Sequence, residues 1–218
     1  LDDGMTRINL KLIADGETEI NPPGPAVDDA AMARLLGELD AVVPGDTVVI
    51  AGSAPCGQPN ARETILQRAA ERGADTVVDA AGEALIRALS YRPFLIKPNR
   101  TELSEAAGRD LPDDDDVIAA AGELQKKGAR HVLVSLGGDG GLLIEENGRV
   151  HRVRAPAGQA RYTVGAGDSM LAGFLAGWQK TGDPAYALRM GIAAGSATAF
   201  SDDLADRAAI ERIFQTLF

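Results

Sequence analysis

Hydrophobic and polar residues alternate with two different periods along the chain, and each change of period predicts a new element. Between Thr6 and Ala14 apolar residues occupy every second position, as in a half-buried strand, and Gly16 offers a turn into a second short strand, Thr18 to Ile20. From Asp28 to Val43 the apolar residues recur at helical spacing, with acidic residues at the start. The chain is therefore expected to begin with a small hairpin, at 6–22, and a helix.

The same two periods continue to the C-terminal end without a repeat or a long linker. Short runs that are apolar throughout predict buried strands, which are typical of a parallel sheet covered by helices on both faces. The predicted strands are 47–51, 76–79, 94–97, 131–135, 141–145 and 150–153, and the predicted helices are 60–72, 82–89, 102–107, 114–127, 167–180, 184–199 and 208–217. This alternation predicts an α/β fold, and one domain over residues 1–218 is the default for this length.

Composition and charge exclude some classes of function. The formal net charge of −10 argues against a general nucleic-acid or membrane-surface role, because phosphate backbones and anionic lipids would both be repelled. The single cysteine, Cys56, fits a reducing cytoplasm and is interpreted as a loop residue. The acidic run at 113–116 is interpreted as a solvated first turn of a helix, which the helix dipole favours, in preference to a metal site.

A glycine-rich turn, Gly165-Ala166-Gly167, leads into an apolar helical stretch and carries Asp168 at the helix start. The glycines leave the backbone free to point N–H groups outward, and the helix adds the positive end of its dipole, so an anion fits there. A carboxylate beside such a turn would repel an anionic substrate unless it accepts a proton from an attacking hydroxyl. The turn therefore indicates a phosphoryl-transfer site, whereas the simpler alternative makes Asp168 only a helix cap.

Two further segments have a composition suited to ligand binding. Residues 132–144 predict a strand, a glycine turn and a second strand, in which exposed backbone amides can meet a nucleotide, although a plain hairpin has the same pattern. Lys97, Asn99 and Glu102 follow a short apolar strand and place a cation, an amide and an acid where a helix begins. Strand ends are where α/β sheets bind ligands.

Taken in this order, the three segments resemble the PfkB, or ribokinase-like, family of sugar kinases. The motifs that carry the resemblance are 164–169, 99–102 and 135–140, supported by 6–11, 23–25, 52–57, 79–85, 94–99 and 196–201. The resemblance implies a ribokinase-like three-layer sandwich with a mostly parallel sheet and a small β lid. It also implies that the chain lacks the N-terminal part of the family's domain, so that the lid and the first strands are incomplete.

The resemblance further implies the activity and the roles of particular residues. ATP would phosphorylate a sugar phosphate, with fructose 1-phosphate giving fructose 1,6-bisphosphate, and Asp168 would act as the base beside the backbone donors of Gly165, Ala166 and Gly167. Mg²⁺ would be held by Asn99 and Glu102, the acceptor would contact Arg7, Ser53 and Asp168, and lid strands would pair subunits into a homodimer in the cytoplasm. The implied nucleotide contacts are Lys97, Asn99, Ser135, Leu136, Gly137, Gly138, Asp139, Gly140 and Ser196.

Other readings of the sequence stay open. Tagatose 6-phosphate or fructose 6-phosphate could be the acceptor with the same nucleotide machinery, and a kinase of an unphosphorylated sugar or nucleoside is a further alternative. A nucleotide-binding fragment without turnover is the alternative from another class of protein. Ser196 lies in a stretch of small residues, 191–199, which could equally serve only close helix packing.

Overall fold

The computed structural model describes residues 5–13 and 17–217. The chain divides into two compact units, Leu1–Val77 and Val78–Phe218. The boundary between the units falls within the strand Asp75–Asp79 and not in a linker. That the chain forms a single domain, as expected from the sequence, stays a prediction.

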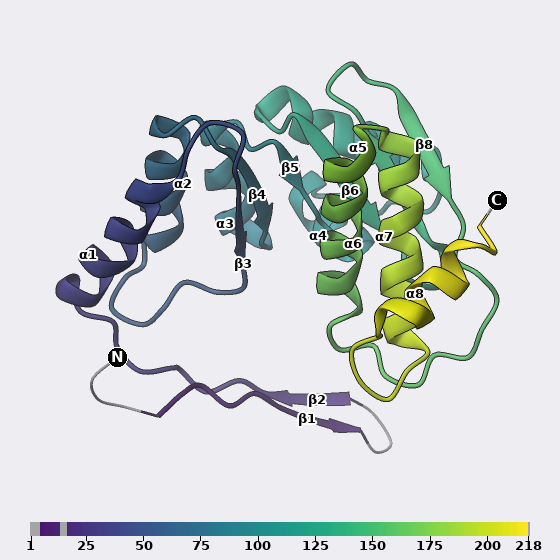
Figure 1. Cartoon of the computed structure of the whole chain (residues 1–218), viewed down its shortest axis with the longest axis horizontal. Helices are drawn as coiled ribbons and strands as arrows, with labels where there is room; N and C mark the ends of the chain where they lie inside the picture. Colours follow the sequence, from purple (N-terminus) through teal and green to yellow (C-terminus); the bar gives the residue numbers. More distant parts are fainter. Residues whose placement is uncertain (1–4, 14–16, 218) are drawn as a thin grey trace. The chain divides into compact units, whose positions relative to one another are not determined.

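The first unit begins with the predicted hairpin. Strands β1 (Leu10–Ile13) and β2 (Glu17–Ile20) pair antiparallel, with Leu10 opposite Ile20 (Figure 1). The first strand starts at Leu10 and not at Thr6, so the alternating pattern overestimated its length. The predicted strand end, Ala14, and the turn residue Gly16 lie outside the described residues.

The rest of the first unit is two helices and the strands beside them. Helix α1 (Asp29–Glu38) is capped by Asp28, whose carboxylate accepts from the Ala31 amide at 2.7 Å, and a 3₁₀ turn (Leu39–Ala41) follows. Strand β3 (Thr47–Ala51) and helix α2 (Ala61–Glu71) come next. The interior of this unit includes the fully buried side chains of Leu66, Ala69 and Val77.

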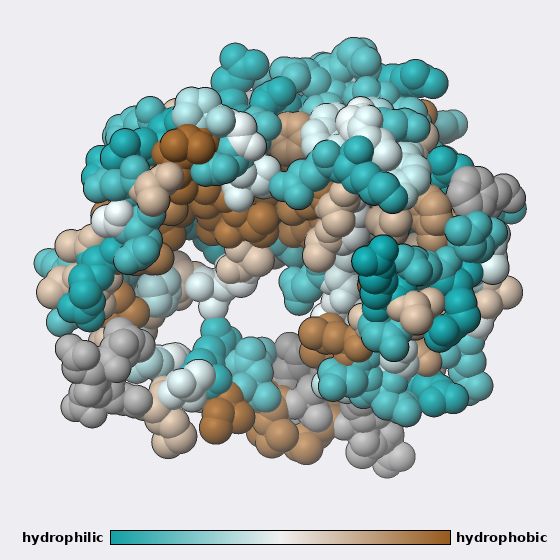
Figure 2. All heavy atoms as spheres, viewed as in Figure 1, coloured by the Kyte–Doolittle hydropathy of each residue, from teal (hydrophilic) through white to brown (hydrophobic). Residues whose placement is uncertain are grey.

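Exposed apolar side chains gather on the hairpin segment. Ile8 is 64% exposed, and Leu10, Leu12 and Ile20 are each about half exposed. Figure 2 shows brown, hydrophobic atoms on the surface of the hairpin segment. A two-stranded hairpin with such a face is marginally stable by itself, and covering the apolar face would stabilise it. Among the described residues, no helix combines the length and apolar character needed to cross a membrane.

The second unit contains the larger part of the sheet. From β4 (Asp75–Asp79), which runs across the unit boundary, the strand order follows the chain through β5 (Leu95–Ile96), β6 (His131–Ser135), β7 (Gly141–Ile144) and β8 (Val150–Val153). β5 and β6 pair parallel, as predicted for a covered sheet, whereas β6–β7 and β7–β8 pair antiparallel. The connections between these last strands are too short for a crossover, so they form hairpins.

Helices cover both faces of this sheet and confirm the α/β class. Helices α6 and α7 pass in front of strands β6 to β8 in Figure 1, while α4 and α5 lie behind. The helices of this unit are α3 (Gly82–Ala88), α4 (Arg100–Ala107), α5 (Asp114–Lys127), α6 (Ala166–Thr181), α7 (Pro184–Ala199) and α8 (Arg207–Phe214), with 3₁₀ turns at Leu89–Tyr91 and Gly137–Asp139.

Small residues allow α6 and α7 to pack closely against each other. A Cβ atom at Gly173 would lie 2.7 Å from the Ala194 Cβ, and one at Gly191 would lie 2.8 Å from the Met170 carbonyl oxygen. Near the start of α6, a Cβ at Gly195 would lie 3.0 Å from the Ala166 carbonyl oxygen. The glycines therefore serve helix packing, and they bring the later turns of α7 beside the N-terminus of α6.

Candidate active site

The first turn of α6 carries the candidate base. The helix begins at Ala166, one residue earlier than predicted, and the residue before it, Gly165, has a left-handed φ of +78° without any side-chain cap. Asp168 therefore stands inside the first turn and is not the helix cap, which removes the simpler interpretation of this residue. Its carboxylate is exposed and makes no hydrogen bond or ion pair with any of the described residues, so it is available to a substrate.

Lys97 places a buried positive charge at the same helix end. Its side chain is 7% exposed, and its Nζ lies 3.0 Å from the carboxylate of Asp79, at the end of β4. A Cβ atom at Gly167 would be 3.3 Å from that Nζ. The ammonium group therefore lies against the start of α6, where a cation and helix amides together attract an anion. Sequence reasoning missed Asp79 as the partner, although a carboxylate at a strand end was the available signal.

Asn99 and Glu102 form a capping box at the start of α4. The Asn99 Oδ1 accepts from the Glu102 amide, and the Glu102 Oε2 accepts from the Asn99 amide, both at 2.8 Å. Within the described part of the chain, no three His, Cys, Asp or Glu side chains are grouped to hold a metal ion. The Glu102 Oε1, which takes no part in the capping box, is still suited to Mg²⁺, which keeps several waters and takes most other ligands from substrate phosphates. The residues thus fit a water-mediated contact better than a protein cage.

The second glycine turn connects β6 to β7. The Leu136 amide donates to the Gly140 carbonyl at 2.9 Å, and the Gly140 amide donates to the Gly137 carbonyl at 3.0 Å. Gly137 and Gly140 have φ of +56° and +95°. A Cβ at Gly140 would approach the Val153 carbonyl oxygen to 2.2 Å, so β8 leaves room only for glycine at this position.

A cavity of about 620 Å³ joins these elements within the second unit. Eight predicted site residues line it: Asn99, Ser135, Gly137, Gly138, Gly140, Ala166, Gly167 and Ser196. The prediction did not include the apolar part of the wall, which comes from Pro156, Met170, Ile192, Ala199, Phe200 and their neighbours. Glycine amides at one part of a cavity and apolar side chains at another suit a ligand that carries both phosphates and a flat ring.

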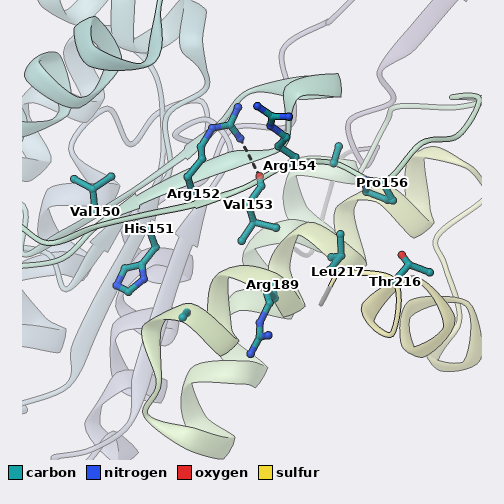
Figure 3. Close-up of a pocket in the computed structure, with 11 residues that line it drawn as sticks. Val150, His151, Arg152, Val153, Arg154, Pro156, Arg189, Thr216 and Leu217 are labelled. Carbon is teal, nitrogen blue, oxygen red and sulfur yellow. Dashed lines mark hydrogen bonds between the residues drawn. The ribbon is translucent and has the colours of Figure 1, made fainter.

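Several predicted residues of the second unit do not line this cavity: Lys97, Glu102, Leu136, Asp139, Gly165 and Asp168. Leu136 buries its side chain, and Asp139 is exposed to solvent. Lys97, Gly165 and Asp168 are instead grouped around the start of α6. A separate cavity of about 730 Å³ lies beside β8 and α7 (Figure 3), and it contains none of the predicted residues. Arg154 and Arg189 in its wall point away from one another, so they do not converge on one ligand position.

In the first unit, the two predicted acceptor contacts lie together. Arg7 Nη1 donates to the Ser53 Oγ at 2.7 Å, and its Nε donates to the Asn9 Oδ1 at 2.8 Å. All three side chains are exposed. Residues 46 positions apart in sequence therefore form one polar group, which orients the forked end of the guanidinium.

Comparison with known proteins assigns the chain to a family. The model of the pfkB family carbohydrate kinases matches residues 1–207. A 1-phosphofructokinase of Bacillus subtilis is 40% identical over 211 residues, covering 96% of this chain and 69% of that protein. A D-tagatose-1-phosphate kinase of Bacillus licheniformis is 36% identical over 207 residues, covering 94% of this chain and 67% of that protein. The chain thus spans about two thirds of the length of these relatives.

Solved structures agree with this assignment. The structure of a putative phosphofructokinase from Staphylococcus aureus has a TM-score of 0.85 at 40% identity, covering 95% of this chain and 68% of that one. Arabidopsis thaliana ribokinase complexed with ribose and ATP has a TM-score of 0.73 at 21% identity, covering 92% and 66%. The second likeness concerns the fold alone, and it confirms the ribokinase-like architecture.

Proposed function

The chain belongs to the pfkB family of carbohydrate kinases, and from this we propose that the protein it comes from transfers the γ-phosphoryl group of ATP to a sugar phosphate. The observation that carries the proposal is the exposed Asp168, which makes no hydrogen bond or ion pair with the residues that the structure describes and stands beside Ala166 and Gly167, two residues that line the glycine-walled cavity. The relatives named 1-phosphofructokinase and D-tagatose-1-phosphate kinase support fructose 1-phosphate as the acceptor, with D-tagatose 1-phosphate as the second candidate.

Asp168 is proposed as the general base. As the acceptor hydroxyl attacks the phosphorus atom, its proton passes to the Asp168 carboxylate, and the bond between the γ-phosphorus and the bridging oxygen of ADP breaks. Of the predicted backbone donors Gly165, Ala166 and Gly167, the Ala166 amide already donates to the Thr163 carbonyl at 3.2 Å. The Gly167 amide, like that of Asp168, stands in the first turn of α6, where amides have no acceptor within the helix, so these two are suited to stabilise charge on the transferred group. The base and the donors thus come from one helix end.

The nucleotide would occupy the cavity of the second unit. The amides of Gly137 and Gly138 and the charge of Lys97 would face its phosphates, and the apolar wall with Ser196 would hold the nucleobase. Mg²⁺, contacted by Glu102 and Asn99 through water, would partly neutralise the triphosphate. On the acceptor side, Arg7 held by Ser53 would grip the sugar phosphate with a forked pair of hydrogen bonds.

A homodimer through the hairpin is a further part of the proposal. The exposed Ile8, Leu10, Leu12 and Ile20 support it, because pairing two hairpins would remove these side chains from water. Leu10→Lys is expected to yield a monomer in light scattering, whereas an exposed substitution elsewhere, Leu204→Lys, keeps the dimer. A wild-type monomer would contradict this part alone. A cytoplasmic location stays a prediction.

The activity is tested by coupled turnover assays on the full protein with ATP and equal concentrations of fructose 1-phosphate, D-tagatose 1-phosphate, fructose 6-phosphate and tagatose 6-phosphate. Asp168→Asn is expected to lower kcat by about 10²–10⁴-fold, the usual contribution of a general base, while ATP binding measured by calorimetry persists. Asp202→Asn is the control, because its carboxylate is also exposed but lies outside this helix. Normal turnover in Asp168→Asn would refute the base assignment.

A further inference from the structure

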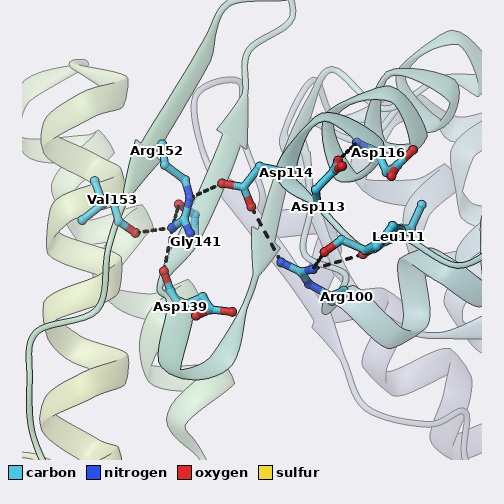
Figure 4. Close-up of polar contacts among 10 residues, drawn as sticks. Arg100, Leu111, Asp113, Asp114, Asp116, Asp139, Gly141, Arg152 and Val153 are labelled. Carbon is cyan, nitrogen blue, oxygen red and sulfur yellow. Dashed lines mark hydrogen bonds and ion pairs between the residues drawn. The ribbon is translucent and has the colours of Figure 1, made fainter.

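Arg152 on β8 makes contacts that the proposed mechanism does not use. Its Nη1 lies 2.7 Å from the Asp139 carbonyl oxygen, 2.9 Å from that of Val153 and 3.5 Å from that of Gly141 (Figure 4). Asp139 belongs to the 3₁₀ turn Gly137–Asp139, and Gly141 begins β7 directly after Gly140. One guanidinium group therefore contacts the backbone on both sides of Gly140, a residue of the cavity wall.

This contact matters because the turn is rich in glycine. Glycine has the widest choice of backbone conformations, so a turn with Gly137, Gly138 and Gly140 loses much conformational entropy when it adopts one of them. Carbonyl oxygens that rotated toward the cavity would also repel phosphate oxygens. By holding the Asp139 carbonyl, Arg152 removes both costs before a nucleotide arrives, which is preorganisation of the site.

Asp114, from the acidic run, in turn holds Arg152. Its Oδ2 accepts from the Arg152 Nε at 2.7 Å, and its Oδ1 lies 3.7 Å from Nη2 of Arg100, which follows Asn99 in the first turn of α4. The helix cap of α5 is the preceding residue, Asp113, whose carboxylate accepts from the Asp116 amide at 2.9 Å. The run is therefore more than a solvated first turn, because Asp114 connects the nucleotide turn to the start of α4 (Figure 4).

We propose that Arg152 is a positioning residue for nucleotide binding, and that Asp114 sets the orientation of its guanidinium group. The inference rests on the proposed nucleotide site at 137–140. The competing explanation is an ion pair that only adds stability. Both side chains are partly exposed, at 28% and 42%, and exposed pairs contribute little to folding. The carbonyl contacts of Arg152 distinguish the two explanations, since they attach the charge to the turn itself.

The first test compares Arg152→Ala with wild type in the full protein. Loss of one charged hydrogen bond corresponds to about a tenfold change in an equilibrium constant, so the KM for ATP and the dissociation constant for ATP are expected to rise about tenfold. The KM for the sugar phosphate at saturating ATP is expected to stay within about twofold of wild type. Arg152→Lys is expected to recover little, because an ammonium group cannot hold Asp114 and the carbonyls in the same fork.

Matched variants separate positioning from stability. Asp114→Asn is expected to raise the KM for ATP. Asp115→Asn removes one negative charge from the same helix turn, but Asp115 is not a partner of Arg152, so this variant is expected to leave the KM for ATP unchanged. Arg154→Ala is the corresponding control for the arginine. Hydrogen exchange at amides 137–142 without ligand is expected to be faster in Arg152→Ala and Asp114→Asn only.

The outcomes decide between the inference and the function it rests on. If the wild-type protein binds ATP, and Arg152→Ala and Asp114→Asn have lower melting temperatures but the wild-type KM for ATP, the positioning role is wrong and the proposed function stands. Wild type that fails to bind ATP would overturn the proposed function and this inference with it. If Arg152→Ala does not fold, the comparison of the single variants Asp114→Asn and Asp115→Asn, by melting temperature and by the KM for ATP, decides in its place.

Discussion

Gly140→Ala is expected to destabilise the protein strongly, because this glycine is required by both its backbone angles and its neighbours. Its φ and ψ are +95° and −122°, a region that residues with a side chain rarely occupy. A Cβ there would lie 2.2 Å from the Val153 carbonyl oxygen and 2.5 Å from the Ala155 amide nitrogen. Both neighbours are backbone atoms, so β8 and the residues after it would have to shift.

The magnitude follows from these two effects. Backbone strain in such a region costs about 1–3 kcal/mol, and forcing extra volume into a packed position costs about 1–3 kcal/mol more. Their sum is about 2–6 kcal/mol of unfolding free energy. Taking the middle of that range, about 4 kcal/mol, the melting temperature of a protein of this size falls by about 8–16 °C.

Two substitutions in the same turn provide a graded control. At Gly137, φ is +56° with open space around the Cβ position, so Gly137→Ala carries only the left-handed strain of about 1–2 kcal/mol. At Gly138 no left-handed φ and no close atom oppose a methyl group, so Gly138→Ala is expected to lie within about 1 kcal/mol of wild type. Urea unfolding of the three variants measures the order. Gly140→Ala unfolding at the same urea concentration as Gly138→Ala would refute the reasoning.

Three further perturbations test other parts of the structure. Asp79→Ala leaves the Lys97 ammonium buried without its carboxylate and is expected to lower the free energy of unfolding by about 3–5 kcal/mol. The double variant Asp79→Leu with Lys97→Met is expected to recover most of this loss, because no buried charge is then left unpaired. A double variant that unfolds in urea as easily as Asp79→Ala would contradict this. Asn99→Ala removes the cap of α4 and is expected to lower the free energy of unfolding, again measured in urea, by about 1 kcal/mol. An unchanged free energy of unfolding would contradict a stabilising role of the capping box. The hydrogen bond from Arg72 lowers the pKa of the Asp40 carboxyl from its ordinary value, so the folded state binds fewer protons there than the unfolded state. The resulting stabilisation is present at neutral pH and is lost as the pH falls through the lowered pKa. Melting curves of wild type and Asp40→Asn are therefore expected to differ at pH 7 and to converge in acid, and a constant difference would exclude this linkage.

Much of the second unit could be predicted from local sequence signals. The predicted bounds of α5 and α7 agree with the structure, because Asp113 and Asp183 cap them and Pro184 suits a first helical position. The glycines at 137 and 140 mark positions with positive φ. The family motifs likewise lie within short segments, so the cavity wall at 135–140 and 166–167 could be anticipated.

By itself, the sequence determined the kinds of elements, their order, the two glycine turns and the family of kinases, since periodicity, caps and motifs all act over a few neighbouring residues. Only the tertiary structure decided which distant side chains meet: Lys97 with Asp79, Arg7 with Ser53, and Arg152 with Asp114. It also showed that Asp168 is not a helix cap and that β1 is shorter than its alternation predicts. The physical reason is that a local pattern states which face of an element is buried, whereas the partner of a polar side chain depends on the packing of elements far apart in the chain.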